Sequence, residues 1–522
     1  MISREAIVLA MAIGYIILLF ILGGIGKWIR LREKTITEFF RPSGIAPAWM
    51  LWFAMGANMH TAFAIPGSMG FYYAHGVGFT MHWVWTLTTP LFVMYALGPR
   101  LRAVAQKYGY VTISEMLGDF YESPVLGAFI AIFLTVANIA YFTANVIGPA
   151  TMLSFGTGGL VPYDWAIFII LLVIMGYCFA GGFKSVFYTD VLQGALMLLA
   201  TWGSAFFMLS LFNWNTWALF SKAYEVSPKH LTIPGALGLV TPAWWFSFSF
   251  APHVFHWAIQ PRNFSYYQLA KSNEEVRKNA LLMGLYLSMI YVPVVILGLG
   301  TKALMPEPPK VGFWTGADAA FPTIMAQYAP VFLWGILIAG SIAAGQSTMD
   351  SDLVAHSGML INDVYKAFLK RDASQTHYLA AGRVLVLVLG IVAGIISINA
   401  AKLPIVTMLV GVSGTFVMVL LPTVLGTLLP MGGFRITKWG AFWSILIGGI
   451  VGFVTTFPLQ LGLPRYLLNP YGLHSAFWAF IATWIVAIVV SLATPPPPRD
   501  SIERFHVFLD RELKALYPPA KA

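Results

Sequence analysis

Stretches of about 20 or more residues without a charged side chain recur from one end of this sequence to the other. A membrane-spanning α-helix needs roughly 20 predominantly apolar residues. The pattern therefore predicts thirteen spans, at about residues 6–25, 45–69, 77–98, 124–156, 165–183, 185–212, 241–261, 280–301, 327–358, 384–401, 403–430, 439–460 and 474–493. We predict an all-α polytopic membrane protein, with a single transmembrane domain over residues 1–500 and a short tail over residues 501–522.

Composition narrows the class further. Of the 522 residues, 58% are hydrophobic and only 10% are charged, whereas an average soluble domain carries about 25% charged residues. These values exclude a soluble enzyme, a disordered chain and a nucleic-acid-binding protein. Cys178 is the only cysteine, so no intrachain disulfide can form.

The net charge of +10 is distributed unevenly between the two sides of the predicted membrane domain. Loops that follow odd-numbered spans hold 24 of the 31 Lys and Arg residues, and the opposite side holds 7. Because positive charge accumulates on the cytoplasmic side, this asymmetry places the N-terminus outside and the C-terminus in the cytoplasm. We expect a multi-pass protein of the cell membrane, plasma or inner.

Two predicted spans contain helix breakers. Span 2 carries Gly56, Pro66 and Gly67, and span 7 carries Pro252 and Pro261. Interrupted helices in corresponding positions of two halves indicate a transporter site near the midplane, with spans 2–6 and 7–11 as five-helix inverted repeats. The alternative is that these residues are ordinary Gly and Pro of membrane helices, accommodated by their neighbours.

The stretch 344–352 in span 9 contains the strongest candidate chemistry. Ala344, Ser347, Thr348 and Ser351 follow helical spacing and share one face. Their hydroxyl and carbonyl oxygens are the hard ligands that a small cation needs, although such hydroxyls can also bond their own helix. Asp350 beside them favours function, because a carboxylate inside a span is costly and usually functional.

A second candidate lies at residues 181–193. Gly181 and Gly182 predict a tight cytoplasmic turn, and Asp190 follows early in the next helix. An acidic residue there could simply complement the helix dipole. Thr189 and Gln193 beside it favour a polar pocket.

These two stretches resemble signature segments of the sodium:solute symporter family. The span-9 resemblance continues through Asn362 to Lys366, and fainter similarities are Glu38 to Phe40, Thr112 to Leu117, Ala270 to Ser272 and Glu503 to Phe505. They occur in order over about residues 37–505. The resemblance implies a LeuT-type fold with a 5+5 inverted-repeat core, and transport by alternating access with Na+ as coupling ion.

The resemblance also implies a core sodium site at the break in span 2. It would use two backbone carbonyls of span 2, together with one carbonyl and two hydroxyls of span 9. Carried over to this sequence, the span-2 ligands are Ala54 and Ala57, and the span-9 ligands are Ala344, Ser347 and Thr348.

Some family members have a second cation site, whose positions match Asp190, Ser347, Asp350 and Ser351. Asp350 stands where some relatives carry a hydroxyl, so this chain has two carboxylates in place of one. Such a pair could bind sodium strongly or share a proton. Both alternatives stay open.

Family geometry places the solute beside the span-2 break. The candidate residues are polar or aromatic and lie in spans 2, 3, 4 and 7: Asn58, His60, Thr61, His82, Tyr141, Asn145, His253 and Trp257. The alternative for each is packing, interfacial anchoring or a hydrogen bond to a neighbouring helix.

We predict a sodium-coupled symporter, without enzymatic activity, that imports a small polar solute of the amino acid, sugar or carboxylate type. The expected partners are sodium, the solute and the lipid bilayer, with the chain functioning as a monomer. Alternatives are a proton-coupled symporter of the same fold, a membrane metal or haem oxidoreductase, a sensor module or a channel. Only His253 and His256 have ligand spacing inside a span, which disfavours the oxidoreductase.

Overall fold

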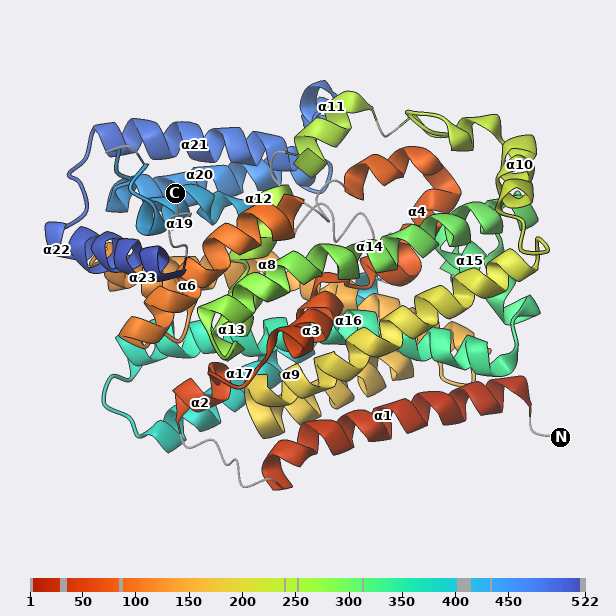
Figure 1. Ribbon diagram of the computed structural model, residues 1–522, viewed down its shortest axis with the longest axis horizontal. Helices are drawn as coiled ribbons and strands as arrows, with labels where there is room; N and C mark the ends of the chain where they lie inside the picture. Colours follow the sequence, from red (N-terminus) through yellow and green to blue (C-terminus); the bar gives the residue numbers. More distant parts are fainter. Residues whose placement is uncertain are drawn as a thin grey trace.

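The computed structural model describes residues 3–28, 35–83, 88–238, 241–250, 253–311, 314–400, 415–431 and 434–516. Helices make up nearly all of its regular structure, and they run mostly along the long axis of the molecule (Figure 1). Two short strands, β1 (Lys310–Val311) and β2 (Trp314–Thr315), pair antiparallel in a connecting segment. The predicted all-α class is confirmed.

The helices of the first half are α1 (Arg4–Trp28), α2 (Ile36–Phe40), α3 (Ala48–Met59), α4 (Ser68–His75), α6 (Tyr95–Tyr108), α7 (Ile113–Phe120), α8 (Pro124–Gly156), α9 (Tyr163–Ser210) and α10 (Thr216–Val226). Those of the second half are α11 (Pro242–Trp245), α12 (His253–Ile259), α13 (Pro261–Leu269), α14 (Asn273–Leu304), α15 (Ala317–Tyr328), α16 (Val331–Met359), α17 (Gln375–Ala400), α19 (Leu421–Leu428), α20 (Lys438–Thr456), α21 (Ser475–Leu492), α22 (Arg499–Ile502) and α23 (Phe508–Leu516). Short 3₁₀ or π-helical turns cover Phe63–Gly67, Val77–Trp83, Thr89–Met94, Pro228–Leu231, Phe246–Phe250, Leu360–Leu369, Met418–Leu420, Arg465–Leu467, Pro470–Gly472 and Glu503–Val507.

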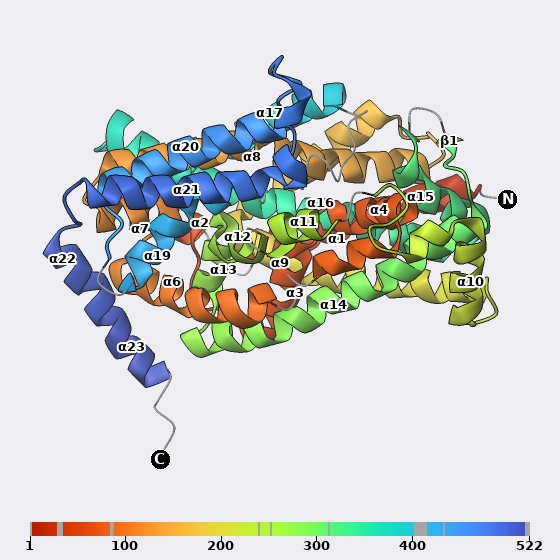
Figure 2. The ribbon, with the colours of Figure 1, turned by 90° about the horizontal axis from the view of Figure 1, so that it is seen from above.

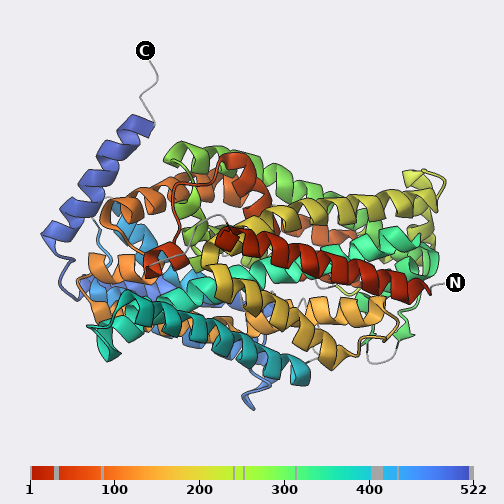
Figure 3. The same ribbon diagram turned by 90° about the horizontal axis from the view of Figure 1, so that it is seen from below.

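Within the described residues, eight helices are long and apolar enough to cross a membrane: Arg4–Gly23, Pro124–Gly156, Tyr163–Ser210, Asn273–Leu304, Val331–Leu369, Gln375–Asn399, Lys438–Thr456 and Ser475–Leu492. One of them, α9, spans two predicted segments. It bends at Gly182, whose φ of 55° and ψ of −150° are not helical, and Figure 3 shows the chain reversing direction there. Glycine is favoured at this bend because other residues rarely adopt that φ. The count of thirteen spans stays a prediction, since residues 401–414 of span 11 lie outside the described residues.

Predicted spans 2 and 7 are both broken. Helix α3 ends at Met59, and the chain continues through the non-helical Ile65 before α4 begins at Ser68. In span 7, α12 ends at Ile259, Gln260 is extended, and α13 begins at Pro261. In span 3, Val77–Trp83 forms 3₁₀-helical turns, and Thr89–Met94 forms a π-helical turn that leads directly into α6.

Helix α16 forms the centre of the molecule. Every residue from Leu337 to Met359 is buried, and the helix packs most extensively against α9 and α8, with further contacts to α1, α3, α13 and α17. Close packing against α8 depends on Gly345, because a Cβ there would lie 2.3 Å from the Cγ of Pro149. A helix buried on all sides is therefore positioned to contribute polar groups to an interior site.

The two ends of the chain lie at opposite ends of the long axis. Figure 2 shows α22 and α23 leaving the bundle at the end far from the start of α1. At that end, Phe505 is buried beside Tyr108, Tyr110 and Phe120, and Arg504 pairs with Asp119 at 3.0 Å. The tail is thus anchored on α6 and α7.

Candidate cation and solute site

The hydroxyl groups of α16 meet the end of the broken helix α3. Thr348 Oγ1 donates a hydrogen bond to the backbone oxygen of Asn58 at 3.0 Å, and Ser347 Oγ lies 3.4 Å from the backbone oxygen of Ala344. The Asn58 side-chain amide donates to the backbone oxygen of Ser347 at 3.4 Å and to Ser351 Oγ. Because α3 stops at Met59, its last carbonyls lack helical partners and form the negative end of the helix dipole.

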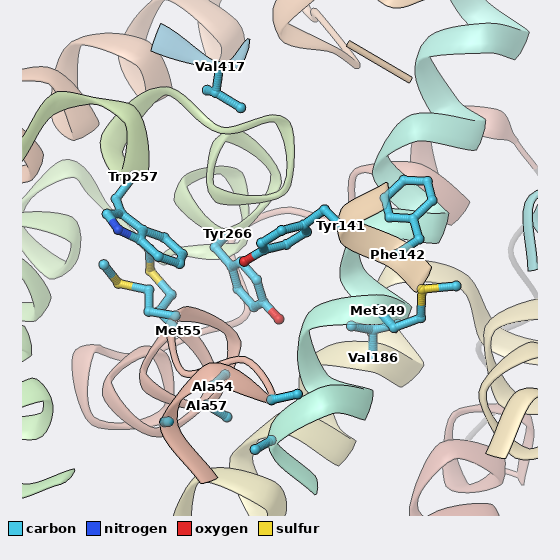
Figure 4. Packing of buried hydrophobic residues seen from close by; sticks show 14 of the residues in the cluster. Ala54, Met55, Ala57, Tyr141, Phe142, Val186, Trp257, Tyr266, Met349 and Val417 are labelled. Carbon is cyan, nitrogen blue, oxygen red and sulfur yellow. The ribbon is translucent and has the colours of Figure 1, made fainter. Parts of the chain in front are cut away.

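The predicted span-2 ligands, Ala54 and Ala57, are buried in the last turns of α3. Figure 4 shows both residues beside the ribbon of α16. The Ala57 carbonyl accepts the backbone N–H of His60 at 3.0 Å, and the carbonyl bonded to the Thr348 hydroxyl is that of Asn58. The structure thus brings the five predicted core-site residues to one junction and adds the Asn58 backbone oxygen.

Asp350 faces helix α9 on the flank of this junction. Tyr177 donates its hydroxyl to Asp350 Oδ2 at 2.6 Å, and the backbone N–H of Ser351 reaches Oδ1 at 2.5 Å. The Sγ of Cys178 lies 3.8 Å from the Asp350 backbone oxygen. Within the described part of the chain, the hydrogen bonds to this buried carboxylate therefore come from neutral groups, a tyrosine hydroxyl and a backbone N–H.

Asp190 occupies the second half of α9. Tyr266 of α13 donates its hydroxyl to Asp190 Oδ2, and among the described residues Asp190 Oδ1 is buried without a hydrogen-bond partner. Ser351 Oγ donates within its own helix, to the Ser347 and Thr348 backbone oxygens at 3.0 Å. The buried, unpartnered oxygen suits a cation ligand.

A further polar network joins α1 to this region. Gln193 Nε2 donates to the Tyr15 hydroxyl at 3.0 Å, and Tyr15 in turn donates to Gln346 Oε1 at 3.0 Å. The Gln193 Oε1 atom is buried with no partner in the described part of the chain. Helix α1, which the sequence left without a role, thus supplies the Tyr15 hydroxyl to Gln193, and Gln193 lies one turn after Asp190 on α9.

The predicted solute residues divide into two groups. Tyr141 and Trp257 lie on either side of Tyr266 in Figure 4, and each ring packs against the guanidinium of Arg262, at 5.3 and 5.4 Å from the ring centres. Arg262 also donates to the Tyr141 hydroxyl at 3.2 Å and to Asn58 Oδ1 at 2.8 Å. These contacts join Tyr141, Trp257 and Asn58 around the buried guanidinium group of Arg262.

The second group supports the break in span 2. Asn145 Oδ1 accepts the backbone N–H of Ala62 at 3.2 Å, which satisfies a donor that the interrupted helix exposes. His60 bonds the Gly56 carbonyl at 2.7 Å through Nδ1 and packs against Tyr286 and Tyr291 of α14. Thr61 is buried within the break. The side chains of His82 and His253 lie outside the described residues.

Sequence reasoning assigned no role to Arg262, Asp352, Tyr177 or Tyr266. Arg262 and Asp352 form a buried ion pair of 2.5 Å between α13 and α16. The available signal was the cost of placing one Arg and one Asp within or next to apolar spans, which requires pairing. No comparable signal identifies the two tyrosines, because membrane tyrosines occur widely as packing residues.

Comparisons with known proteins agree with this architecture. The model of the sodium:solute symporter family matches residues 44–448. A sodium/pantothenate symporter of Escherichia coli K12 is 25% identical over 456 residues, covering 84% of this chain and 88% of the relative. A sodium/proline symporter of Staphylococcus aureus RF122 is 25% identical over 458 residues, covering 83% and 82%.

One solved structure shows the same fold. It is a Na+-coupled sialic acid symporter in a substrate-bound, outward-open state, described as having a novel Na+ site. The TM-score is 0.73 at 16% sequence identity, and the match covers 94% of this chain and 98% of the other.

Proposed function

The chain belongs to the sodium:solute symporter family, and we propose that it imports a small polar solute by alternating access. It is a multi-pass membrane transporter with Na+ as coupling ion and not an enzyme. The observation that carries the proposal is the junction of α3 and α16. There the Thr348 hydroxyl bonds the Asn58 backbone oxygen at the end of the broken helix, and the buried Ser347 hydroxyl lies next to it on α16.

The proposed core sodium site uses the chemistry of this junction. Its ligands are the carbonyl oxygens of Ala54, Ala57 and Ala344 and the hydroxyl oxygens of Ser347 and Thr348. Neutral oxygens suit a hard monovalent cation, and the negative end of the α3 dipole favours positive charge there. A sodium ion at this position would tie α3 to α16, because each helix supplies part of its coordination shell.

A second cation is proposed beside Asp190, Asp350, Ser347 and Ser351. Support comes from Asp190 Oδ1, which has no hydrogen-bond partner among the described residues, and from the uncharged donors that bond the Asp350 carboxylate. Proton coupling is the second candidate, because Asp190 and Asp350 are both buried and two buried carboxylates at one site can share a proton. Sodium and proton coupling at these residues are distinguished by the cation dependence of uptake.

The solute is proposed to bind near the span-2 break, against Tyr141 and Trp257, with Asn58, His60, Thr61, His82, Asn145 and His253 as further candidates. The two rings supply apolar surface, and Asn58 supplies amide groups that also contact the cation junction. Amino acids, sugars and carboxylates all fit this mixture of apolar and hydrogen-bonding groups. The similar proteins reported above are named as symporters of pantothenate, proline and sialic acid.

We propose an N-out, C-in orientation in the cell membrane, with thirteen spans over residues 1–500, a cytoplasmic tail over 501–522 and a functional monomer. The uneven Lys and Arg distribution supports the orientation. Single cysteines near Lys271 and Arg371 should escape an impermeant label applied to intact cells. Strong external labelling at position 371 contradicts both the orientation and the span count.

A thermal-stability screen of the purified protein tests the function. Amino acids, sugars, monocarboxylates and pantothenate are each added with sodium or with potassium at equal ionic strength. A ligand that binds only the folded state raises the melting temperature, so the solute should stabilise the protein more with sodium than with potassium. Stabilisation that is equal in both salts, together with equal uptake, contradicts sodium coupling.

A further inference from the structure

Arg262 and Asp352 are the partners of a fully enclosed ion pair. Their side chains are 1% and 2% exposed, and Arg262 Nη1 lies 2.5 Å from Asp352 Oδ2. The other guanidinium nitrogens are also used: Nε donates to Asn58 Oδ1 at 2.8 Å and Nη2 to the Tyr141 hydroxyl at 3.2 Å. The planar guanidinium is therefore held along its whole edge by three partners.

These four residues come from four different elements. Asn58 lies on α3 of the broken span 2, and Arg262 lies on α13, directly after the break at Gln260, while Tyr141 and Asp352 belong to the continuous helices α8 and α16. Any rocking of the broken helices against the continuous ones must pull Arg262 away from Asp352 and Tyr141. The cluster therefore crosses the interface that alternating access has to open.

The cluster also lies on one defined side of the cation junction. Asp352 follows Thr348 by four residues on α16, which is about 6 Å along the helix axis. Arg262 directly follows the interruption at Gln260 and Pro261. With the N-terminus outside, both chain segments run toward the cytoplasm at this point, so the ion pair lies on the cytoplasmic side of the proposed sodium site.

We propose that Arg262 and Asp352 form the cytoplasmic gate of the transport path, and that Asn58 links this gate to sodium. This inference rests on the proposed function. Asn58 contacts both systems, because its carbonyl and amide groups bond α16 while its Oδ1 holds Arg262. Sodium that ties α3 to α16 keeps Asn58 and Arg262 in place, so bound sodium favours the closed gate.

Cysteine labelling from the cytoplasmic side measures the gate directly. Ser265 is buried one turn after Arg262 and lines a small cavity with Ala355 and Gly358. The reporter is Ser265→Cys in a chain whose only native cysteine is removed by Cys178→Ala. An impermeant maleimide is applied to inside-out vesicles, in sodium and in potassium.

We expect slow labelling of this parent, slower still in sodium. Arg262→Gln and Asp352→Asn should each accelerate labelling about tenfold or more, since either change removes one partner of a buried pair, and should abolish the effect of sodium. The matched control is Arg504→Gln, which breaks the partly exposed pair with Asp119 at the tail and should leave the rate unchanged.

The double variant Arg262→Gln with Asp352→Asn keeps the test decisive, because it leaves no unpaired buried charge. Residues that act as one gate are non-additive, so the double variant should label no faster than the faster single variant. A folded double variant that labels at the parent rate overturns the gate. If the labelling rate of the parent does not depend on sodium while the variants still label faster, the gate proposal holds and the proposed coupling to sodium is wrong.

Discussion

Two aspartates of α16 lie two residues apart and have opposite surroundings. They point about 200° apart around the helix, so Asp350 faces α9 and Asp352 faces α13. Asp350 receives hydrogen bonds from a tyrosine hydroxyl and a backbone amide. Asp352 receives a guanidinium at 2.5 Å. Both are buried, so burial alone does not separate their roles.

The difference between the partners of Asp350 and Asp352 indicates which carboxylate is available to a cation. Asp352 already has its countercharge, and giving it up would leave Arg262 buried and unpaired, which is expensive. Among the described residues, the donors to Asp350 are neutral, and a metal ion or a proton can supplement them without leaving a charge behind. Asp350 is therefore the candidate ligand, and Asp352 is the structural or gating partner.

The largest effect should follow Asp352→Asn. Removing one partner of a buried ion pair costs about 3–5 kcal/mol, so we expect a clear fall in melting temperature and little remaining uptake. Adding Arg262→Gln should restore part of the stability, because the orphaned charge is gone. If Asp352→Asn unfolds at the parent temperature, the pair contributes little and the contrast with Asp350 disappears.

Removing the hydroxyls of the core site should have the second-largest effect. Ser347→Ala and Thr348→Ala should insert normally but raise the sodium concentration for half-maximal uptake by roughly tenfold or more, as expected for losing a hydrogen-bonding group that contacts a charge. Solute affinity at low sodium should fall with it, because coupling between two ligands is reciprocal.

The control for the core site is Thr348→Ser, which keeps the oxygen and loses only a methyl group. We expect this variant to behave nearly as the parent in sodium-dependent uptake. Unchanged sodium activation in both alanine variants shows that the hydroxyls serve only helix packing, and the core-site proposal is then wrong.

Asp190→Asn should have an intermediate effect. It neutralises the carboxylate whose Oδ1 is unpartnered, so we expect several-fold weaker activation by the coupling cation, in the range of losing one charged ligand. Uptake is measured against sodium concentration and against pH. The control is Asp318→Asn on α15, where burial raises the pKa of the carboxyl to about 6. If Asp190→Asn leaves both dependences intact, Asp190 only complements its helix.

Asp350→Ser should have the smallest effect of the four. Serine restores a hydroxyl where some relatives carry one, so uptake should persist while the dependence on sodium and pH changes. Tyr177→Phe is the matched variant, because it removes the hydroxyl that bonds Asp350. A loss of transport as severe as that of Asp352→Asn would show that the two aspartates have equivalent structural roles.

Local patterns in the sequence determined the class of the protein and the position of the hydroxyl-bearing face of span 9. Long apolar stretches predict membrane helices because the bilayer requires them. Pro and Gly in span 2 predict the break that the structure places between Met59 and Ser68. Helical spacing alone puts Ser347 and Thr348 on one face of span 9. Each of these predictions depends on residues within a few turns of one another.

Only the tertiary structure decided which distant side chains meet. Arg262 and Asp352 are 90 residues apart in the chain. Tyr266 of α13 bonds Asp190 of α9, 76 residues away in the chain. His60, which stays a predicted solute residue, packs against Tyr286 and Tyr291 of α14. These pairings depend on the rotation and depth of whole helices, which are set by packing of small residues and by interhelical hydrogen bonds. The pattern within a single helix carries no information about them.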